Sequence, residues 1–188
     1  MARWEPGADG RLREAALTLF LERGYEQTTV AEIAQRAGLT ARTFFRYFAD
    51  KREVLFAGSE ALGEQLDAAL AAAPDTATPL AAVAEALGAV ADVIGEDRDH
   101  SRRRQAVIAA NAELQERELI KLAGWSAALA DGLVRRGVDE QTASLAAQTG
   151  TAAFRVAFER WLADSGDRSL ADTLRDSFGR LSTVIAGG

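Results

Sequence analysis

Apolar residues recur every three to four positions along almost the whole chain, which is the spacing of one face of an α-helix. Leu12, Ala16 and Leu19 form one such face and predict a first helix that ends near Gly24. Later stripes predict further helices at residues 50–72, 79–95, 101–111, 113–136, 139–164 and 168–186. We find no convincing alternation of apolar and polar residues of the kind that predicts a β-strand. The pattern therefore predicts an all-α fold of about nine helices in total.

Two short helices between residues 28 and 51 are marked by cap residues and a glycine. Thr29 and Glu32 form a capping box, which starts a helix at Val30. Gly38 ends that helix, because glycine readily adopts the left-handed conformation found at helix ends. Thr40 then caps the next helix. This order predicts a helix-turn-helix at about residues 29–48, with the second helix placed for a DNA groove.

The second helix has an aromatic side and a polar side. Phe44 and Phe48 fall together and anchor the helix to a core, while Arg42 and Arg46 fall on the opposite side. Arginine can bind guanine through two hydrogen bonds in the major groove, which suits this face to reading DNA. The alternative is a solvated face of an ordinary helical protein. The order of cap, glycine and cap favours DNA binding.

The stretch from about Gly10 to Gly58 resembles the N-terminal domain of the TetR family of bacterial repressors. The matching pieces are AALTLFLERGYEQTTVAEIAQRAGLTARTFFRYF and DKREVL. The resemblance implies base and backbone contacts by the second helix, with Thr29, Thr40 and Lys51 near phosphates. The tyrosine common in the family is Phe45 here, so any phosphate hydrogen bond from that ring is lost. The predicted DNA-contacting residues are Thr29, Thr40, Ala41, Arg42, Thr43, Phe45, Arg46, Tyr47 and Lys51.

The charge is distributed unevenly between two predicted domains. We expect a DNA-binding domain over residues 1–56 and a helical ligand-binding and dimerisation domain over residues 57–188. The first holds nine Lys and Arg against eight Asp and Glu, a formal charge of +1, and the second holds thirteen against twenty, a charge of −7. The acidic residues are thus concentrated away from the part that would meet phosphates. We expect binding to depend on salt, because phosphate contacts release counterions.

The predicted helix at 139–164 is apolar on two sides and must therefore be covered on both. The resemblance implies that the last two long helices form a four-helix interface between two copies of the chain. The alternative is that both stripes pack inside one subunit. The predicted dimer residues are Leu145, Thr149, Ala152, Val156, Leu174, Phe178 and Leu181.

The middle helices carry candidates for a ligand pocket, although apolar residues at helical spacing are more often ordinary core. The candidates are Leu62, Leu66, Leu87, Val90, Ile108, Leu122, Trp125, Leu129 and Phe158. The charged stretch DRDHSRRR at 97–104 could offer arginines to an anionic ligand, or it could be a solvated helix start. Arg3 and Trp4 belong to a short N-terminal arm, for which disorder and a minor-groove contact are the alternatives.

Missing residue types exclude several functions. The chain has no cysteine, which excludes disulfides, thiol catalysis and cysteine-ligated metals, and its one histidine cannot make a histidine-based metal site. We find no nucleophile–base pairing, Walker loop or dinucleotide fingerprint, so we expect no enzyme and no cofactor. No apolar run approaches the roughly 20 residues of a membrane span. Residues 1–10 lack the apolar core of a signal peptide, so we expect a cytoplasmic protein.

The sequence favours a transcription regulator over two other functions. In the favoured interpretation a homodimer binds a palindromic double-stranded DNA operator, represses transcription, and is released by a small, largely apolar effector. The second is a DNA-binding regulator without a small-molecule ligand, which is constitutive or answers to a partner protein. The third is an enzyme, and no catalytic motif in the sequence supports it.

Overall fold

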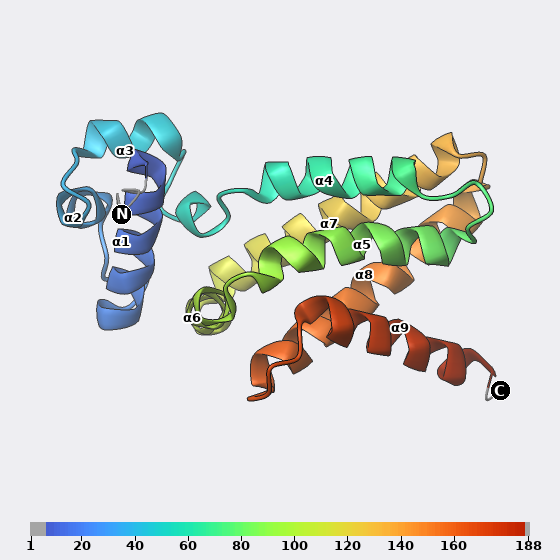
Figure 1. The fold of residues 1–188 in the computed structure, drawn as a ribbon. Helices are drawn as coiled ribbons and strands as arrows, with labels where there is room; N and C mark the ends of the chain where they lie inside the picture. Colours follow the sequence, from blue (N-terminus) through green and yellow to red (C-terminus); the bar gives the residue numbers. More distant parts are fainter. Residues whose placement is uncertain (1–6, 187–188) are drawn as a thin grey trace, which may run out of the picture. The chain divides into compact units, whose positions relative to one another are not determined.

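The computed structural model describes residues 7–186, and these residues form nine α-helices and one short 3₁₀-helix, without a strand (Figure 1). This confirms the predicted all-α class; Arg3 and Trp4 lie outside the described residues. The elements are α1 (Ala8–Arg23), α2 (Val30–Arg36), α3 (Ala41–Tyr47), η1 (Glu53–Leu55), α4 (Ser59–Ala72), α5 (Pro79–Gly95), α6 (Arg98–Ala109), α7 (Ala112–Arg135), α8 (Glu140–Ala163) and α9 (Leu170–Ala186).

The chain divides into two compact units. The N-terminal unit comprises the chain up to Gly58 together with residues 102–118, and the helical unit comprises residues 59–101 and 119–188. The first division lies close to the boundary predicted at residue 56. Residues 102–118 join the N-terminal unit because Ile108 and Leu114 are buried in the same apolar cluster as α1, α2 and α3. Both α6 and α7 therefore contribute residues to each unit.

Most predicted helices are confirmed, and one is wrong. The helices predicted at 79–95, 113–136, 139–164 and 168–186 begin and end within two residues of α5, α7, α8 and α9. The continuous helix predicted at 50–72 does not form. Glu53–Leu55 form only the 3₁₀-helix η1, and Val54, Leu55 and Phe56 are all buried. Gly58 then turns the chain at φ +86°, and α4 begins only at Ser59.

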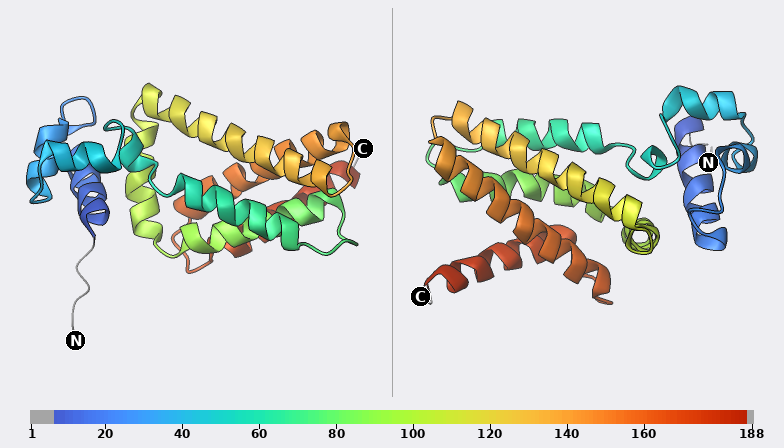
Figure 2. Two further views of the ribbon diagram at one scale, coloured as in Figure 1. Left: turned by 90° about the horizontal axis from the view of Figure 1, so that it is seen from above. Right: turned by 180° about the vertical axis from the view of Figure 1, so that it is seen from behind.

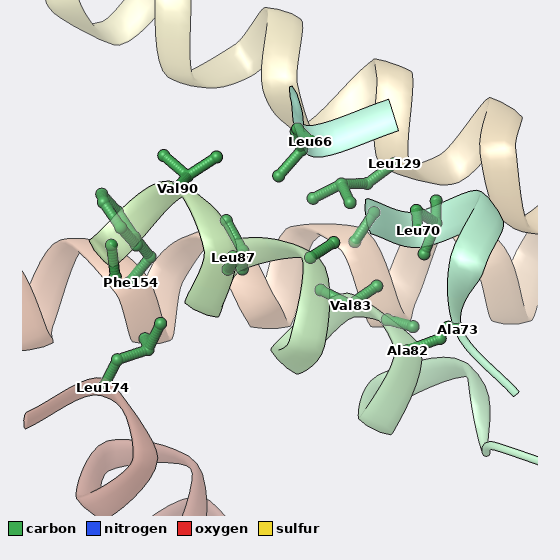
Figure 3. Packing of buried hydrophobic residues seen from close by; sticks show 14 of the residues in the cluster. Leu66, Leu70, Ala73, Ala82, Val83, Leu87, Val90, Leu129, Phe154 and Leu174 are labelled. Carbon is green, nitrogen blue, oxygen red and sulfur yellow. The ribbon is translucent and has the colours of Figure 1, made fainter. Parts of the chain in front are cut away.

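The core of the helical unit is built around α5. This helix packs against α4, α8 and α9, and two further views show it lying between α4 and α8 (Figure 2). Because it is covered on several sides, α5 is apolar around most of its circumference. Figure 3 shows Val83, Leu87 and Val90 of α5 meeting Leu66 of α4 and Phe154 of α8 in this core.

Gly150 of α8 allows α5 and α8 to approach closely. A Cβ atom added at this glycine would collide with Cγ1 of Val83 and would lie 3.3 Å from Cδ1 of Leu87. Both neighbours are fully buried, so neither can move aside easily. The small residue at this position therefore serves packing within one subunit.

Gly150→Ala is expected to lower the free energy of unfolding by about 1–3 kcal/mol, because an extra methyl group overpacks a filled core. Gly124→Ala is the matched control: Gly124 is exposed within α7, and an added Cβ there would meet no atom within 4 Å. We expect that control to be neutral or stabilising by up to about 1 kcal/mol through helix propensity. Thermal or urea unfolding measures both, and equal stabilities would contradict the close packing.

Candidate nucleic-acid interface

Local hydrogen bonds predicted from the sequence begin both α2 and α3. The hydroxyl of Thr29 accepts a hydrogen bond from the amide of Glu32 at 3.3 Å, and the carboxylate of Glu32 accepts one from the amide of Thr29 at 2.9 Å. This confirms the capping box at the start of α2. Gly38 takes φ +69°, and the hydroxyl of Thr40 accepts a hydrogen bond from the amide of Thr43 at 3.2 Å to begin α3. The predicted helix-turn-helix is therefore present.

Two phenylalanines fix the orientation of α3. Phe44 and Phe48 are buried in the N-terminal unit with Ile33 and Ala34 of α2, and the two rings lie 5.4 Å apart between centroids. Both face the core, so the opposite side of a helix only seven residues long must face solvent. The aromatic anchor predicted from the sequence is confirmed, and it determines which residues of α3 a ligand can reach.

The exposed side of α3 carries two cations and two aromatic rings. Arg42, Thr43, Phe45 and Arg46 line an open depression on the surface. The ring of Phe45 is 58% exposed, although an apolar ring gains nothing from water. Arg46 donates a hydrogen bond to the hydroxyl of Tyr47 at 3.1 Å, and its guanidinium lies 4.9 Å from the centre of that ring. Within residues 7–186 no carboxylate pairs with Arg42 or Arg46, so both are available to an anionic partner.

The other predicted contacts on the motif have local roles as well. Thr29 and Thr40 are exposed, and each uses its hydroxyl to cap a helix. Ala41 is the half-buried first residue of α3. The structure thus brings these three together with Arg42 and Arg46 on the helix-turn-helix. Their contact with DNA stays a prediction.

Lys51 lies beyond α3 and points back into the protein. Its Nζ donates hydrogen bonds to the carbonyl oxygens of Tyr25 at 2.8 Å, Thr28 at 3.2 Å and Glu26 at 3.4 Å. The same ammonium lies 4.2 Å from the centre of the Tyr25 ring. The phosphate contact implied by the resemblance stays a prediction for Lys51, and this internal use of its charge was not visible in the sequence.

Arg36 and Arg23 tie α1 to α2 rather than extending the basic surface. Arg36 pairs with Glu22 at 2.9 Å, and Arg23 pairs with Glu32 at 3.0 Å. The hydrogen bond from Arg36 holds the pKa of the Glu22 carboxyl below its usual value. All four side chains are well exposed, so each pair adds little stability. The positive surface of the motif is therefore centred on α3.

Residues 102–118 are held in the N-terminal unit by half-buried and exposed polar contacts as well as by their apolar side chains. Arg104 donates hydrogen bonds to the carbonyl of Leu55 at 2.8 Å and to Glu118 at 3.0 Å. Burial lowers the pKa of Arg104, while Glu118 opposes that shift. Arg103 pairs with Glu14 of α1 at 2.9 Å. The sequence suggested that the arginines at 102–104 bind an anionic ligand or lie in a solvated helix start. Neither interpretation included the contacts that Arg103 and Arg104 make within the N-terminal unit.

The predicted pocket residues are divided between the two units. Leu66, Leu87, Val90 and Leu129 are fully buried in the core of the helical unit. Ile108 instead belongs to the core of the N-terminal unit, which α6 reaches with its second half. The remaining candidates are half-buried residues of the helical unit, namely Leu62, Leu122, Trp125 and Phe158. Trp125 meets Phe154 edge to face with ring centroids 5.6 Å apart.

The predicted dimer residues fall into an exposed set and a buried set. On α8, Leu145 is 69% exposed, Val156 is 48% exposed, Ala152 is exposed and Thr149 is half-buried. On α9, Phe178 and Leu181 are half-buried, whereas Leu174 is buried in the core of its own subunit. A further exposed apolar residue of α9, Val184, was missed because the sequence stripe pointed to its neighbours.

Residues 7–186 contain neither a candidate metal site nor a helix able to span a membrane. In that part of the chain, no three or more His, Cys, Asp or Glu side chains gather in a way that could hold a metal ion. None of the described helices combines the length and apolar character needed to cross a membrane. The surface of α3 is thus the clearest candidate site in the described chain.

Comparison with known proteins adds independent evidence on the family. The family model described as bacterial regulatory proteins, tetR family, matches residues 12–57, and the model described as the MftR C-terminal domain matches residues 77–186, more than half of the chain. The transcriptional regulator TcmR of Streptomyces glaucescens is 45% identical over 91 residues, 48% of this chain and 38% of that protein. The chain thus spans less than half of the length of TcmR in this match.

Two further similarities extend over almost the whole chain. A mycofactocin biosynthesis transcriptional regulator, MftR of Mycobacterium tuberculosis, is 27% identical over 180 residues, 94% of this chain and 88% of that protein. The structure of a complex of SmeT with triclosan has a TM-score of 0.64 at 19% identity, covering 92% of this chain and 90% of SmeT. FadR of Thermus thermophilus in complex with lauroyl-CoA has a TM-score of 0.57 at 23% identity, covering 90% and 91%. These two structures share the fold.

Both family matches agree with the structure, which has a capped helix-turn-helix and exposed arginines on α3. The chain belongs to the TetR family of bacterial DNA-binding transcription regulators.

Proposed function

We propose that this protein is a repressor that binds a palindromic operator as a homodimer and leaves it when a small, largely apolar effector binds the helical unit. The proposal rests on a row of residues on α8, in which Leu145, Ala152 and Val156 are exposed and Thr149 is half-buried. A monomer gains nothing by presenting such a row to water, whereas a second copy of the chain would bury it.

A dimer would give the DNA-binding motif its symmetry. A two-fold interface uses the same patch on both copies, so the row on α8 would meet its own counterpart. Val184 of α9 is 76% exposed and extends the apolar set to the neighbouring helix, which packs against α8. Two helix-turn-helix motifs related by a two-fold axis read two half-sites in inverted order, which makes the operator palindromic.

The exposed face of α3 supports recognition in the major groove. Arg42 and Arg46 offer donors for guanine, Thr43 can contact either a base or a phosphate, and Phe45 offers an apolar surface of the kind that contacts a thymine methyl group. None of the residues in the first turn of α3 is acidic, so no carboxylate repels phosphates there. Direct reading by this face, with additional phosphate contacts, would give specific and salt-dependent binding.

Half-buried apolar side chains in the helical unit support an apolar effector. Leu62, Leu122, Trp125 and Phe158 are large residues that the fold leaves partly exposed. FadR and SmeT, whose structures are similar, were solved with lauroyl-CoA and with triclosan, both of which carry large apolar parts, and FadR is a transcriptional repressor. An effector that prefers the conformation unable to bind DNA must weaken DNA binding by the same coupling free energy.

One observation favours a second candidate, a regulator without a small-molecule ligand. Four of the predicted pocket residues, Leu66, Leu87, Val90 and Leu129, are completely buried by other side chains. A core that is already filled leaves them no surface for an effector. A thermal-shift screen with metabolites distinguishes the two candidates, since a ligand that binds the native state raises the melting temperature.

Selection of bound sequences from random DNA tests the proposal as a whole. We expect an inverted repeat whose half-sites are recovered together. Recovery of single half-sites, or of no sequence at all, would refute the dimeric operator complex. The recovered operator is the probe for the variants that follow.

Arg42→Ala and Arg46→Ala are each expected to weaken operator binding by about 1–3 kcal/mol, because each removes a donor that can reach a base edge. Binding is measured with the operator and with a scrambled duplex. A base contact lowers affinity for the operator alone, whereas equal losses on both duplexes would assign the arginine to phosphates. No loss on either duplex would mean that this face of α3 does not meet DNA.

Val156→Glu is expected to yield folded monomers with weak operator affinity, because a carboxylate in the row on α8 cannot be buried against its counterpart without a large penalty. Sedimentation at micromolar concentration measures the assembly, and circular dichroism checks the fold. Val93→Glu is the matched control, since Val93 is 42% exposed on α5 outside the row. A monomeric wild-type protein would contradict the interface.

An apolar effector is expected to change the fluorescence of Trp125, which is half-buried beside Phe154 in the helical unit. Lauroyl-CoA and triclosan are the first probes. Trp125→Phe should remove most of the change, whereas Trp161 is already buried against Arg98 and should respond little. The same ligand should release the operator near its dissociation constant. If small, highly charged metabolites bind most tightly, the effector class is wrong.

A further inference from the structure

The side chain of Arg46 is held by its neighbour Tyr47 at the end of α3. Its guanidinium donates a hydrogen bond to the hydroxyl of Tyr47 at 3.1 Å. The central carbon of the same guanidinium lies 4.9 Å from the centre of the Tyr47 ring, a distance at which a cation is attracted to an aromatic face. The hydroxyl and the ring thus hold one cation, although both side chains are exposed.

The ring of Tyr47 is itself backed by the core. Tyr47 is the last residue of α3, and the centre of its ring lies 6.3 Å from the centre of the Phe48 ring. Phe48 is buried in the N-terminal unit, where it packs against Phe44. The contacts therefore run from the buried Phe48 through Tyr47 to Arg46, and they tie a long side chain to a fixed part of the protein.

A tyrosine suits this position better than an acidic residue would. Arg42 lies four residues before Arg46 on the same side of α3, and two cations at this spacing repel each other. A carboxylate would attract Arg46 more strongly, but it would also repel the phosphates of DNA. The phenol hydroxyl is an uncharged acceptor. Tyr47 therefore holds the guanidinium without adding negative charge to the face that would meet DNA.

The contact with Tyr47 leaves Arg46 able to bind a base. A guanidinium has five N–H donors, of which Tyr47 takes one, and a guanine takes two. An arginine without such a partner samples many rotamers, and ordering it at an interface costs affinity. Because the hydroxyl of Tyr47 accepts from Arg46, its own hydrogen can still be donated to a phosphate. A backbone contact by Tyr47 is thus compatible with its contact to Arg46.

We propose that Tyr47 is a positioning residue, which holds the guanidinium of Arg46 in the place from which it reads one base pair of each operator half-site. This inference rests on the operator binding proposed above and deepens it, because it names what fixes one of the reading side chains. The base preference that Arg46 provides would then depend on a residue that need not touch that base pair.

Selection from random DNA, repeated with each variant, locates the effect. Arg46→Ala should abolish the preference at one base pair of each half-site. Tyr47→Leu removes both the hydroxyl and the ring, and it should relax the preference at that same base pair. Tyr47→Phe keeps the ring and loses only the hydroxyl, so it should relax the preference less. A merely structural role would weaken the preference at all base pairs alike.

A double-mutant cycle measures how far Tyr47 acts through Arg46. In the wild-type background we expect Tyr47→Leu to weaken operator binding about tenfold and Tyr47→Phe about threefold, in keeping with the cost of ordering one long side chain. In the Arg46→Ala background, Tyr47→Leu should weaken binding by less than about threefold, because no guanidinium is left to position.

Two checks accompany the cycle. Both variants of Tyr47 should melt within about two degrees of the wild type, since the side chain is exposed. Leu21→Ala is the matched control, because Leu21 is 43% exposed, as is Tyr47, and lies on α1 in the same unit. We expect it to leave operator affinity and base preference unchanged.

Several results would overturn the inference. Equal losses from Tyr47→Leu in the two backgrounds would mean that Tyr47 acts independently of Arg46. Relaxed preference at a different base pair would make Tyr47 a reader of DNA in its own right. Unchanged affinity and preference for Tyr47→Leu, or wild-type binding by Arg46→Ala, would leave no positioning role. Failure of the wild-type protein to select any operator would instead refute the proposed function.

Discussion

The structure of the DNA-binding end depends on side chains that α6 and α7 contribute to its core. Ile108 and Leu114 are fully buried beside residues of α1 and α3, and the half-buried Arg104 donates hydrogen bonds to the carbonyl of Leu55 and to the carboxylate of Glu118. Other residues of α6 and α7 belong to the helical unit, so each of these helices is shared between the two units.

Helix α8 is apolar on two opposite faces. One of its faces is buried with α5 and α9, where Gly150 makes room for Val83 and where Trp161 packs under the guanidinium of Arg98, 5.0 Å from the ring centre. Its opposite face carries Leu145 and Val156 into solvent. A helix that is apolar on both sides leaves one apolar face in water in a monomer, which is why the proposed interface is placed on this face.

Features that depend on neighbouring residues, such as helix caps, were predictable from the sequence. Contacts between residues far apart in the chain were not. The caps at Thr29 and Thr40 were predictable because the partner amide is three residues away. The helix across 50–72 was wrong because helical spacing alone cannot show that Val54, Leu55 and Phe56 would all be buried. The partners of Lys51 and Arg104 lie far along the chain, and a cation in a sequence gives no sign of which carbonyl or carboxylate it will meet. For that reason the sequence predicted ligand or solvent contacts for Lys51 and for the arginines at 102–104, and none of their contacts within the protein.

The first turn of α3 has no acidic residue, a feature that it shares with α5. A helix is stabilised by acidic residues in its first turn, and α1, α2 and α8 each have one, whereas α3 has none. Instead, Arg42 stands at its second position, where the positive end of the helix dipole opposes a cation by about 0.3–1 kcal/mol. A neutral threonine supplies the cap, so no carboxylate stands at the end of the helix that would approach phosphates. The bound DNA would provide the missing negative charge, so the same arrangement that weakens the isolated helix strengthens the complex. The buried Phe44 and Phe48 offset the local cost, because they hold α3 in place while its exposed side remains suited to an anionic partner.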